Sequence, residues 1–231
     1  MKIGIIGAME EEVSQLIEQM EEKREDTLAG MTFYEGKLRK KDVVVVQSGI
    51  GKVNMAVCTQ ILIDQFHVTH LINTGVAGGL YKDIEVGDIV ISSDALQHDM
   101  DATGFGYEPG VIPRMETSVF QADQEMVETA KEVCHEVNPD IQCFVGRVVS
   151  GDQFISDNEK KHQLIENFKG YCAEMEGAAM AQAAYLNHVP FLILRAISDK
   201  ADQEAAGSYE EFEKMAILHI VRLVLGILDK E

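Results

Sequence analysis

Six short runs of mostly apolar, β-branched-rich residues constrain the fold of this chain more than any other feature. They span residues 3–6, 43–46, 70–72, 89–91, 143–149 and 191–197. A strand with one face in water alternates apolar and polar residues, whereas a continuous apolar run suits a strand that is covered on both faces. The runs therefore predict buried strands with helices packed against both sides of the sheet.

Helical spacing of apolar residues appears between these runs, at 13–20, 55–63, 127–137, 178–186 and 212–223. Two capping boxes, Ser156-x-x-Glu159 and Ser208-x-x-Glu211, predict two further helix starts. Segment 31–38 alternates weakly and is expected to form a hairpin with 43–48. The alternation predicts an α/β three-layer sandwich whose twisted, mixed, largely parallel sheet is flanked by helices. No Pro-rich or single-charge tract divides residues 1–231, so we expect a single domain.

The charge balance excludes some partner classes. The chain carries 39 acidic and 20 basic residues, a net charge of -19, which repels phosphate backbones and anionic lipid and argues against nucleic-acid and membrane partners. Its four cysteines are irregularly spaced without a Cys-x-x-Cys pair, which favours reduced thiols in a cytoplasmic protein. The apolar segment 215–228 is too short to span a bilayer and is expected to be a core-packed helix.

Small residues follow five of the predicted strands, at Gly7-Ala8, Ser48-Gly49, Thr74-Gly75, Ser150-Gly151 and Ser198-Asp199. In an open α/β sheet, ligands bind beyond the carboxyl ends of the strands. Any one glycine is explained as well by a simple turn from strand to helix. The five together favour a ligand-binding crevice.

Three motifs do not match the cofactor sites that they resemble. Gly4-x-x-Gly7 lacks the spacing of a dinucleotide fingerprint, and in Gly49-Ile50-Gly51-Lys52 the next residue is Val53, where a P-loop requires Ser or Thr. His98-Asp99-Met100-Asp101 has no second group of ligands at metal-binding spacing. We expect neither a dinucleotide, an NTPase site nor a metal.

Acidic residues are the main candidates for chemistry, and each has a structural alternative. Glu12 lies in the first turn of a predicted helix, where a solvated capping acid is the simpler interpretation. In Glu174-Met175-Glu176, expected to open a helix, at most one carboxylate faces a given ligand atom. Asp199 beside Ser198 can be tuned for proton transfer or can cap the next turn. Segment 104–113, with Phe105 and Tyr107, suits a ligand lid and a subunit contact equally.

Ordered blocks at 2–12, 48–53, 73–75, 77–79, 86–90, 105–107, 150–152, 174–176 and 195–199 resemble the nucleoside phosphorylase and hydrolase superfamily. Within it, the chain is most similar to the 5′-methylthioadenosine/S-adenosylhomocysteine nucleosidases. The resemblance runs essentially end to end. It implies a twisted mixed sheet with flanking helices and a homodimer in which a loop of the partner completes each pocket.

The resemblance also implies a reaction: hydrolysis of the N-glycosidic bond between adenine and a 5′-thio-substituted ribose, with 5′-deoxyadenosine as a further substrate and a role in methionine salvage. It implies no metal or organic cofactor. Asp199 matches the general acid at adenine N7, with Ser198 helping to hold it. Glu12 matches the residue that activates water at C1′, a role that comes from the resemblance and not from the spacing.

Binding residues are implied in the same way. Glu176 matches the carboxylate that binds the ribose hydroxyls, Met175 packs beneath the sugar, and Glu174 with Arg195 matches a supporting polar network. Phe154 matches the aromatic that stacks on adenine. The other matches are Ile155, with main-chain contacts to the base, and the pocket residues Ala8, Met9, Ile50, Phe105, Tyr107, Pro113 and Tyr209.

Two positions depart from the pattern of the family. Val76 stands where some relatives carry Ser, and Tyr209 stands where others carry Phe. We expect a modest effect of Val76 and an altered water access or 5′-tail preference from Tyr209.

Three rival functions agree less well with the sequence. A purine nucleoside phosphorylase requires arginines at its phosphate site, which the strand ends lack, and Glu12 repels the anion. Hydrolases of AMP or futalosine also require an anion-binding group. A non-catalytic nucleoside-binding protein predicts loss of Glu12, Glu176 or Asp199, and all three are present.

Overall fold

The computed structural model describes residues 1–230, without the side chain of Glu210. The strands are β1 (Lys2–Gly7), β2 (Glu21–Leu28), β3 (Met31–Leu38), β4 (Lys41–Gln47), β5 (His70–Gly79), β6 (Ile89–Gln97), β7 (Phe120–Gln121), β8 (Cys143–Ser150), β9 (Cys172–Glu174) and β10 (Phe191–Asp199). The α-helices are α1 (Glu10–Glu18), α2 (Lys52–Asp64), α3 (Gln124–Val137), α4 (Asn158–Phe168), α5 (Gly177–Asn187) and α6 (Ala205–Lys230). A 3₁₀ turn, η1, spans Thr103–Phe105.

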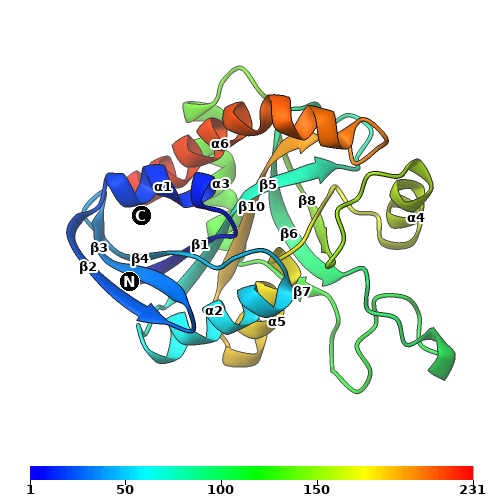
Figure 1. Cartoon of the computed structure of the whole chain (residues 1–231), viewed down its shortest axis with the longest axis horizontal. Coiled ribbons are helices and arrows are strands. Elements are labelled where there is room, and N and C mark those ends of the chain that lie inside the picture. The colour runs from blue at the N-terminus through cyan, green and yellow to red at the C-terminus, as the bar shows by residue number, and fades with distance from the viewer. Residues whose placement is uncertain (231) are drawn as a thin grey trace.

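The elements form one mixed sheet between two layers of helices. Its centre is the parallel series β4, β1, β5 and β10. β6 runs antiparallel to β10 and parallel to β8, and β2 and β3 continue the other side as antiparallel strands. Helices α1, α3 and α6 cover one face and α2 and α5 the other (Figure 1). The predicted α/β sandwich is confirmed.

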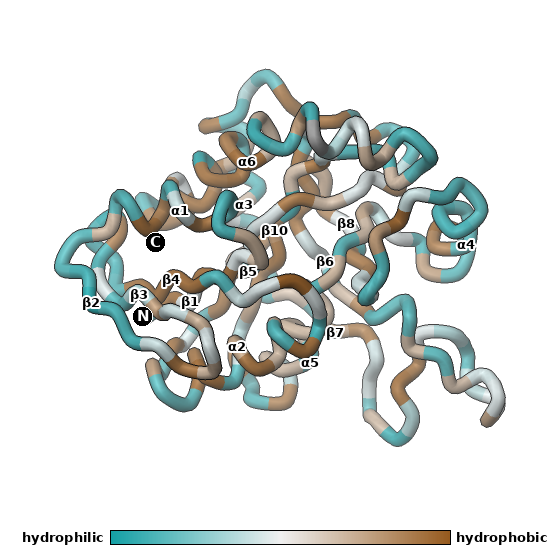
Figure 2. The backbone as a smooth tube through the Cα atoms, viewed as in Figure 1, coloured by the Kyte–Doolittle hydropathy of each residue, from teal (hydrophilic) through white to brown (hydrophobic). Residues whose placement is uncertain are grey.

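Burial explains why the strand runs are continuously apolar. Along β4, Val43 and Val45 pack toward α1 and α6, whereas Val44 and Val46 pack toward α2 and α5. All four side chains are fully buried. Hydrophobic colour follows the central strands and the inner helices, while β2 is mostly hydrophilic (Figure 2). The six predicted strands are all present.

Several predicted boundaries are wrong. The hairpin of β3 and β4 is extended by β2, an exposed, charged edge strand with no apolar run to reveal it. The cap of α4 is Asp157, whose carboxylate accepts from the Glu159 N–H at 2.7 Å, instead of Ser156. Helix α6 begins at Ala205, so Ser208 lies inside it. Glu174 ends β9, so only Glu176 stands at the start of α5.

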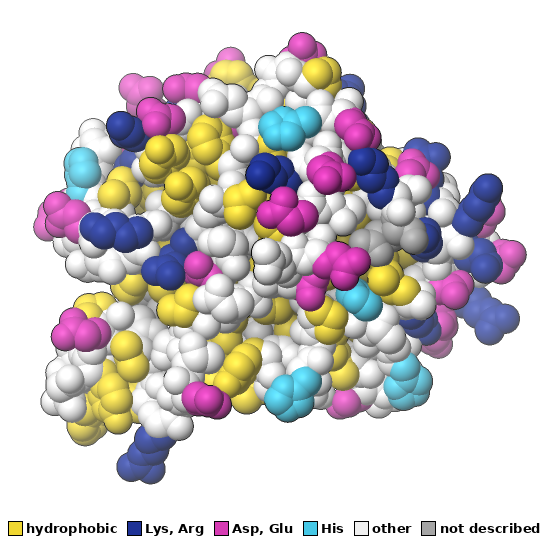
Figure 3. All heavy atoms as spheres, turned by 180° about the vertical axis from the view of Figure 1, so that it is seen from behind, with side chains coloured by type: hydrophobic (Ala, Val, Ile, Leu, Met, Phe, Trp, Pro, Cys, Tyr) yellow, Lys and Arg dark blue, Asp and Glu magenta, His cyan; other side chains and the backbone are white. Residues whose placement is uncertain are grey.

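Helix α6 is core-packed, as predicted for its apolar segment, with Ile220, Leu223 and Ile227 buried. Among residues 1–230, no helix is both long and apolar enough to cross a bilayer. The cysteines are free thiols, and those at 58, 134 and 172 are buried. Acidic and basic side chains are interspersed on the face seen in Figure 3.

Candidate active site

A cavity of about 150 Å³ lies where β1, β5 and β10 end. Eleven of the predicted site residues line it, namely Ala8, Met9, Glu12, Ile50, Phe154, Glu174, Met175, Glu176, Ser198, Asp199 and Tyr209. A larger groove of about 480 Å³ between α1 and β3 contains none of them. The smaller cavity is the candidate site because it gathers buried titratable groups.

The predicted crevice at the strand ends is present in part: Ala8, Ser198 and Asp199 line the cavity, whereas Ser48 and Gly49 line the larger groove and Ser150-Gly151 lines neither. Strand β5 does not end at Thr74-Gly75 but continues to Gly79, so this pair lies within the strand. The continuation brings Val76, Ala77 and Gly78 to the cavity wall. The backbone of β5 thereby becomes part of the site.

Glu12 is a capping acid, but it is not solvated. Its side chain is 2% exposed, and Oε2 accepts from the N–H groups of Ala8 at 2.7 Å and Met9 at 3.0 Å. Oε1 accepts from the Val76 N–H at 3.1 Å. Burial raises the pKa of Glu12, although the charge of Arg195 and the three N–H groups lower it. Glu12 is therefore a buried carboxyl group at the cavity wall, with a pKa above its usual value.

Arg195 is buried behind the cavity and links the acidic residues. Its Nη2 donates to Asn73 Oδ1 and to Glu174 Oε2. A Cβ at Gly75 would overlap both Arg195 Nη1 and Glu12 Oε1, so only glycine leaves room for them. The carboxylates raise the pKa of Arg195 against the lowering effect of burial, which keeps a positive charge among the acids.

The two glutamates after β9 have different surroundings. Glu174 accepts from Arg195, from Ser150 Oγ and from the Gly177 N–H at 2.8 Å, so its oxygens are occupied by the protein. Glu176 Oε1 accepts from the Gly51 N–H at 2.8 Å. Burial, followed by the charge of Glu174, raises the pKa of Glu176 to about 7. Glu176 is therefore the glutamate of the pair with acceptor capacity left for a ligand.

Asp199 ends β10 and is 2% exposed. Its Oδ1 accepts from the Ala201 N–H at 2.8 Å, and Ser198 Oγ lies 2.9 Å from Oδ2. Burial raises the pKa of Asp199, with a further increase from the charge of Asp202, against the lowering effect of these two hydrogen bonds. Asp199 therefore caps the turn and also faces the cavity.

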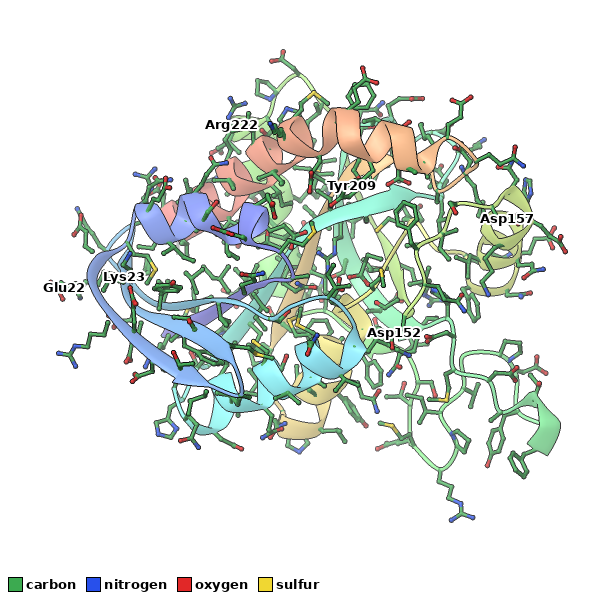
Figure 4. The ribbon with its side chains drawn as sticks, viewed as in Figure 1. Glu22, Lys23, Asp152, Asp157, Tyr209 and Arg222 are labelled. Atoms are coloured by element: carbon green, nitrogen blue, oxygen red, sulfur yellow. The ribbon has the colours of Figure 1, made fainter. Side chains whose placement is uncertain are left out.

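The part of the cavity wall formed by Phe154 and Tyr209 is apolar apart from the Tyr209 hydroxyl. The rings of Phe154 and Tyr209 meet edge to face, with centroids 6.3 Å apart. The Tyr209 hydroxyl donates to Glu213 Oε1 at 2.7 Å and lies 3.3 Å from Met9 Sδ. Tyr209 projects from the first part of α6 (Figure 4). Flat rings on this wall suit an aromatic ligand.

Five predicted site residues do not line the cavity within one chain. Phe105, Tyr107 and Pro113 lie on the loop after β6, which extends away from the sheet, and Phe105 is 87% exposed (Figure 1). Ile155 is buried among apolar residues beneath α4, and Arg195 lies behind the acids.

Sequence reasoning missed three lining residues, Ala77, Gly78 and Ala173, and the supporting Asn73 and Ser150. Asn73 and Ser150 adjoin or belong to two of the small-residue pairs that the sequence analysis noted, Thr74-Gly75 and Ser150-Gly151. Ala173 lies on the three-residue strand β9, which carries no periodicity to detect.

Comparisons with known proteins agree with this geometry. The family model described as the phosphorylase superfamily matches residues 2–229. A 5′-methylthioadenosine/S-adenosylhomocysteine nucleosidase from Exiguobacterium sp. is 43% identical over 231 residues, which is 100% of this chain and 98% of that protein.

Two solved structures are similar over the whole chain. One is a 5′-methylthioadenosine/S-adenosylhomocysteine nucleosidase from Neisseria meningitidis in complex with methylthio-immucillin-A, with a TM-score of 0.95, 38% identity and coverage of 100% and 99% of the two chains. The other is a futalosine hydrolase of Helicobacter pylori, with a TM-score of 0.94, 34% identity and coverage of 100% and 98%.

Proposed function

The chain belongs to the phosphorylase superfamily and, within it, to the 5′-methylthioadenosine/S-adenosylhomocysteine nucleosidases, and we propose that it hydrolyses the N-glycosidic bond of these two nucleosides. The products are adenine and the 5′-substituted ribose. One observation carries the proposal: two carboxyl groups with raised pKa, Glu12 and Asp199, line the same small cavity. Enzymes that cleave glycosidic bonds usually use two carboxyl groups in one site.

Asp199 is the proposed general acid. Adenine leaves poorly as an anion, so a proton delivered to N7 lowers the barrier to C1′–N9 cleavage. Burial favours the protonated form of Asp199, and Ser198 with the Ala201 N–H fixes the direction of the carboxyl group. Asp199 is ionised once the base has left.

Glu12 is the proposed acceptor for the proton of the attacking water. Water adds to C1′ as the bond to adenine breaks, and Glu12 takes one of its protons. Three backbone N–H groups hold its carboxylate still, which supports this role without movement of the side chain. Glu176 binds the ribose hydroxyls and, with Glu174 behind it, stabilises the positive charge that develops on the sugar.

Charge argues against the rival substrates. Among the described residues, four carboxylates and no Lys or Arg line the cavity. Phosphate, AMP or the carboxylate of futalosine would enter without a counter-ion, whereas the carboxylate of S-adenosylhomocysteine brings its own ammonium group. The likeness to a futalosine hydrolase is therefore interpreted as a shared fold and shared base cleavage, with a different 5′ substituent.

An adenine-release assay in phosphate-free buffer tests the proposal. We expect release from methylthioadenosine, S-adenosylhomocysteine and 5′-deoxyadenosine, and a strict requirement for phosphate would instead identify a phosphorylase. Asp199→Asn is expected to lower kcat at least about a thousandfold while nucleoside binding stays within a few-fold, because only proton donation is lost. Wild-type rates in that variant would remove Asp199 from the mechanism.

The remaining features of the proposal are one domain over residues 1–231, a cytoplasmic location, a part in methionine salvage and a homodimer. The outer faces of α2 and α5 support the dimer, because Val53 is 75% exposed and Val57 and Leu186 are also exposed there. A neighbouring copy would bring its own Phe105 loop to complete the pocket.

A further inference from the structure

Three motifs that the proposed reaction does not use meet at one place. Lys52 follows the loop after β4, Asp99 follows β6, and Asp152 follows β8. Sequence reasoning rejected the first two as a P-loop and a metal cluster. Asp152 lies directly beside the start of α2 (Figure 4).

The three residues form a closed ring of hydrogen bonds in which each contributes two groups. The Lys52 ammonium donates to Asp99 Oδ1 at 2.5 Å, and the Lys52 N–H donates to Asp152 Oδ1 at 2.9 Å. The Asp152 N–H closes the ring by donating to Asp99 Oδ2 at 2.9 Å. The Lys52 and Asp99 side chains are only 18% and 17% exposed, so solvent screens the ion pair less than at an open surface.

The ring stands behind two walls of the cavity. Ile50 and Gly51 precede Lys52 directly, and Phe154 follows Asp152 by two residues. The loop that carries Ile50 also donates the Gly51 N–H to Glu176. Gly51 has φ +100°, which favours glycine, and a Cβ there would lie 3.2 Å from Asp152 Oδ1, so the backbone of this loop packs directly against the ring.

We propose that Lys52, Asp99 and Asp152 are positioning residues for the nucleosidase reaction. The ring fixes the distance between the Ile50 loop and the Phe154 loop and directs the Gly51 N–H at Glu176. It contacts no substrate. This inference rests on the proposed function, and it assigns a task to three residues that the mechanism leaves unused.

The charge state of the ring is consistent with this task. Burial alone would raise the pKa of Asp99, but the Lys52 ammonium and the Asp152 N–H lower it below its usual value. Asp99 therefore stays ionised at neutral pH and keeps both oxygens as acceptors. An asparagine at position 99 would offer one acceptor oxygen to two donors, the Lys52 ammonium and the Asp152 N–H.

The test compares Asp99→Ala and the isosteric Asp99→Asn with the wild type, using methylthioadenosine. We expect kcat/KM to fall roughly 10- to 100-fold, with most of the change in KM, because the base and ribose walls lose their alignment. The acid limb of kcat/KM should move to higher pH. Glu176 then loses the Gly51 N–H that lowers its pKa, while the charges of Glu174 and Glu12, which raise it, and of Arg195, which lowers it, remain.

The matched control is Asp94→Ala. Asp94 lies on β6, five residues before Asp99, and pairs with Arg147 at 2.5 Å with similar burial, but it lies outside the cavity and the ring. Equal kinetic effects of Asp94→Ala and Asp99→Ala, or an unmoved acid limb in both Asp99 variants, would overturn the proposal. In a double-mutant cycle, Lys52→Met and Asp152→Ala should be strongly non-additive, because either change opens the ring. Additive effects of these two substitutions on kcat/KM would also contradict the proposal.

Amide hydrogen exchange separates this inference from the proposed function. In the unliganded protein, Asp99→Asn should increase exchange across residues 50–54 and 151–154 but not in the central strands. This readout does not depend on turnover, so it stands even where no adenine is released. Unchanged exchange in both segments would show that the ring does not hold the two loops in place, and it would refute the proposal.

Discussion

At the scale of single residues, burial and hydrogen bonding act in opposite directions on the same carboxyl groups. Burial raises the pKa of Glu12 and Asp199, and N–H and hydroxyl donors lower it. Donors alone would lock both groups as anions, and burial alone would keep both protonated. In both groups burial outweighs the donors, so the pKa lies above its usual value, as the proposed proton transfers require.

Glu176 provides a prediction about stability and pH. Its pKa is raised from 4.5 to about 7, so between these values the folded protein binds the extra proton. The free energy of unfolding therefore falls as pH rises from 4.5 to 7, and the whole penalty is present above pH 7. Glu176→Gln is expected to stabilise the unliganded protein by roughly 1–3 kcal/mol at pH 8 and by almost nothing near pH 4.5.

Thermal unfolding of both proteins across this pH range measures the effect. Glu166→Gln, which removes an exposed carboxylate on α4, is the control for the loss of one acidic side chain. Equal stabilisation by Glu176→Gln at pH 4.5 and pH 8 would contradict the assignment. Glu176→Gln should also bind nucleosides more weakly, because the carboxylate that lowers stability is the group proposed to bind the ribose hydroxyls.

At the scale of elements, β5 shows why a glycine within a strand matters here. Gly75→Ala is expected to lower kcat at least about 100-fold and the free energy of unfolding by about 1–3 kcal/mol, because the new methyl group displaces Arg195 or Glu12. Ile72→Val on the same strand is the control, costing about 1 kcal/mol with kcat unchanged. A Gly75→Ala enzyme as active as Ile72→Val would show that the buried acids tolerate displacement.

Long apolar elements were predictable, and short or polar ones were not. Runs such as 43–46 identify strands buried on both faces, and this physical requirement leaves a strong pattern. Strand β2 is an exposed edge and β9 has three residues, so neither buries enough apolar surface to leave one. The errors at Ser156 and Ser208 arise because capping signals are local, whereas tertiary packing sets the start of each helix.

The candidate site, like the fold, was predictable only in part. A crevice at the strand ends followed from the sequence, because Gly7-Ala8 and Ser198-Asp199 mark where β1 and β10, the two strands that flank β5, stop. The meeting of Glu12 with Asp199 did not follow, since pairing between distant segments leaves no local trace. Only the family resemblance suggested a role for Glu12.

At the scale of the whole molecule, the exposed apolar faces of α2 and α5 predict self-association. Sedimentation at micromolar concentration should give a dimer. Leu186→Glu is expected to yield a monomer with a raised KM for methylthioadenosine, because a buried unpaired charge costs several kcal/mol and the partner loop is lost. Leu218→Glu, at an exposed position of α6 on the opposite face, should remain dimeric. A monomeric wild type with full activity would end the dimer proposal.

The site takes residues from both ends of the chain, and this has a consequence for biosynthesis. Strand β5 lies between β1 and β10, whose residues are nearly 200 positions apart in sequence. Such long-range pairings form late, after the loops between them have closed. A nascent chain that has not yet released β10 from the ribosome holds Glu12 but no Asp199, so the cavity is complete only after nearly the whole chain has been synthesised.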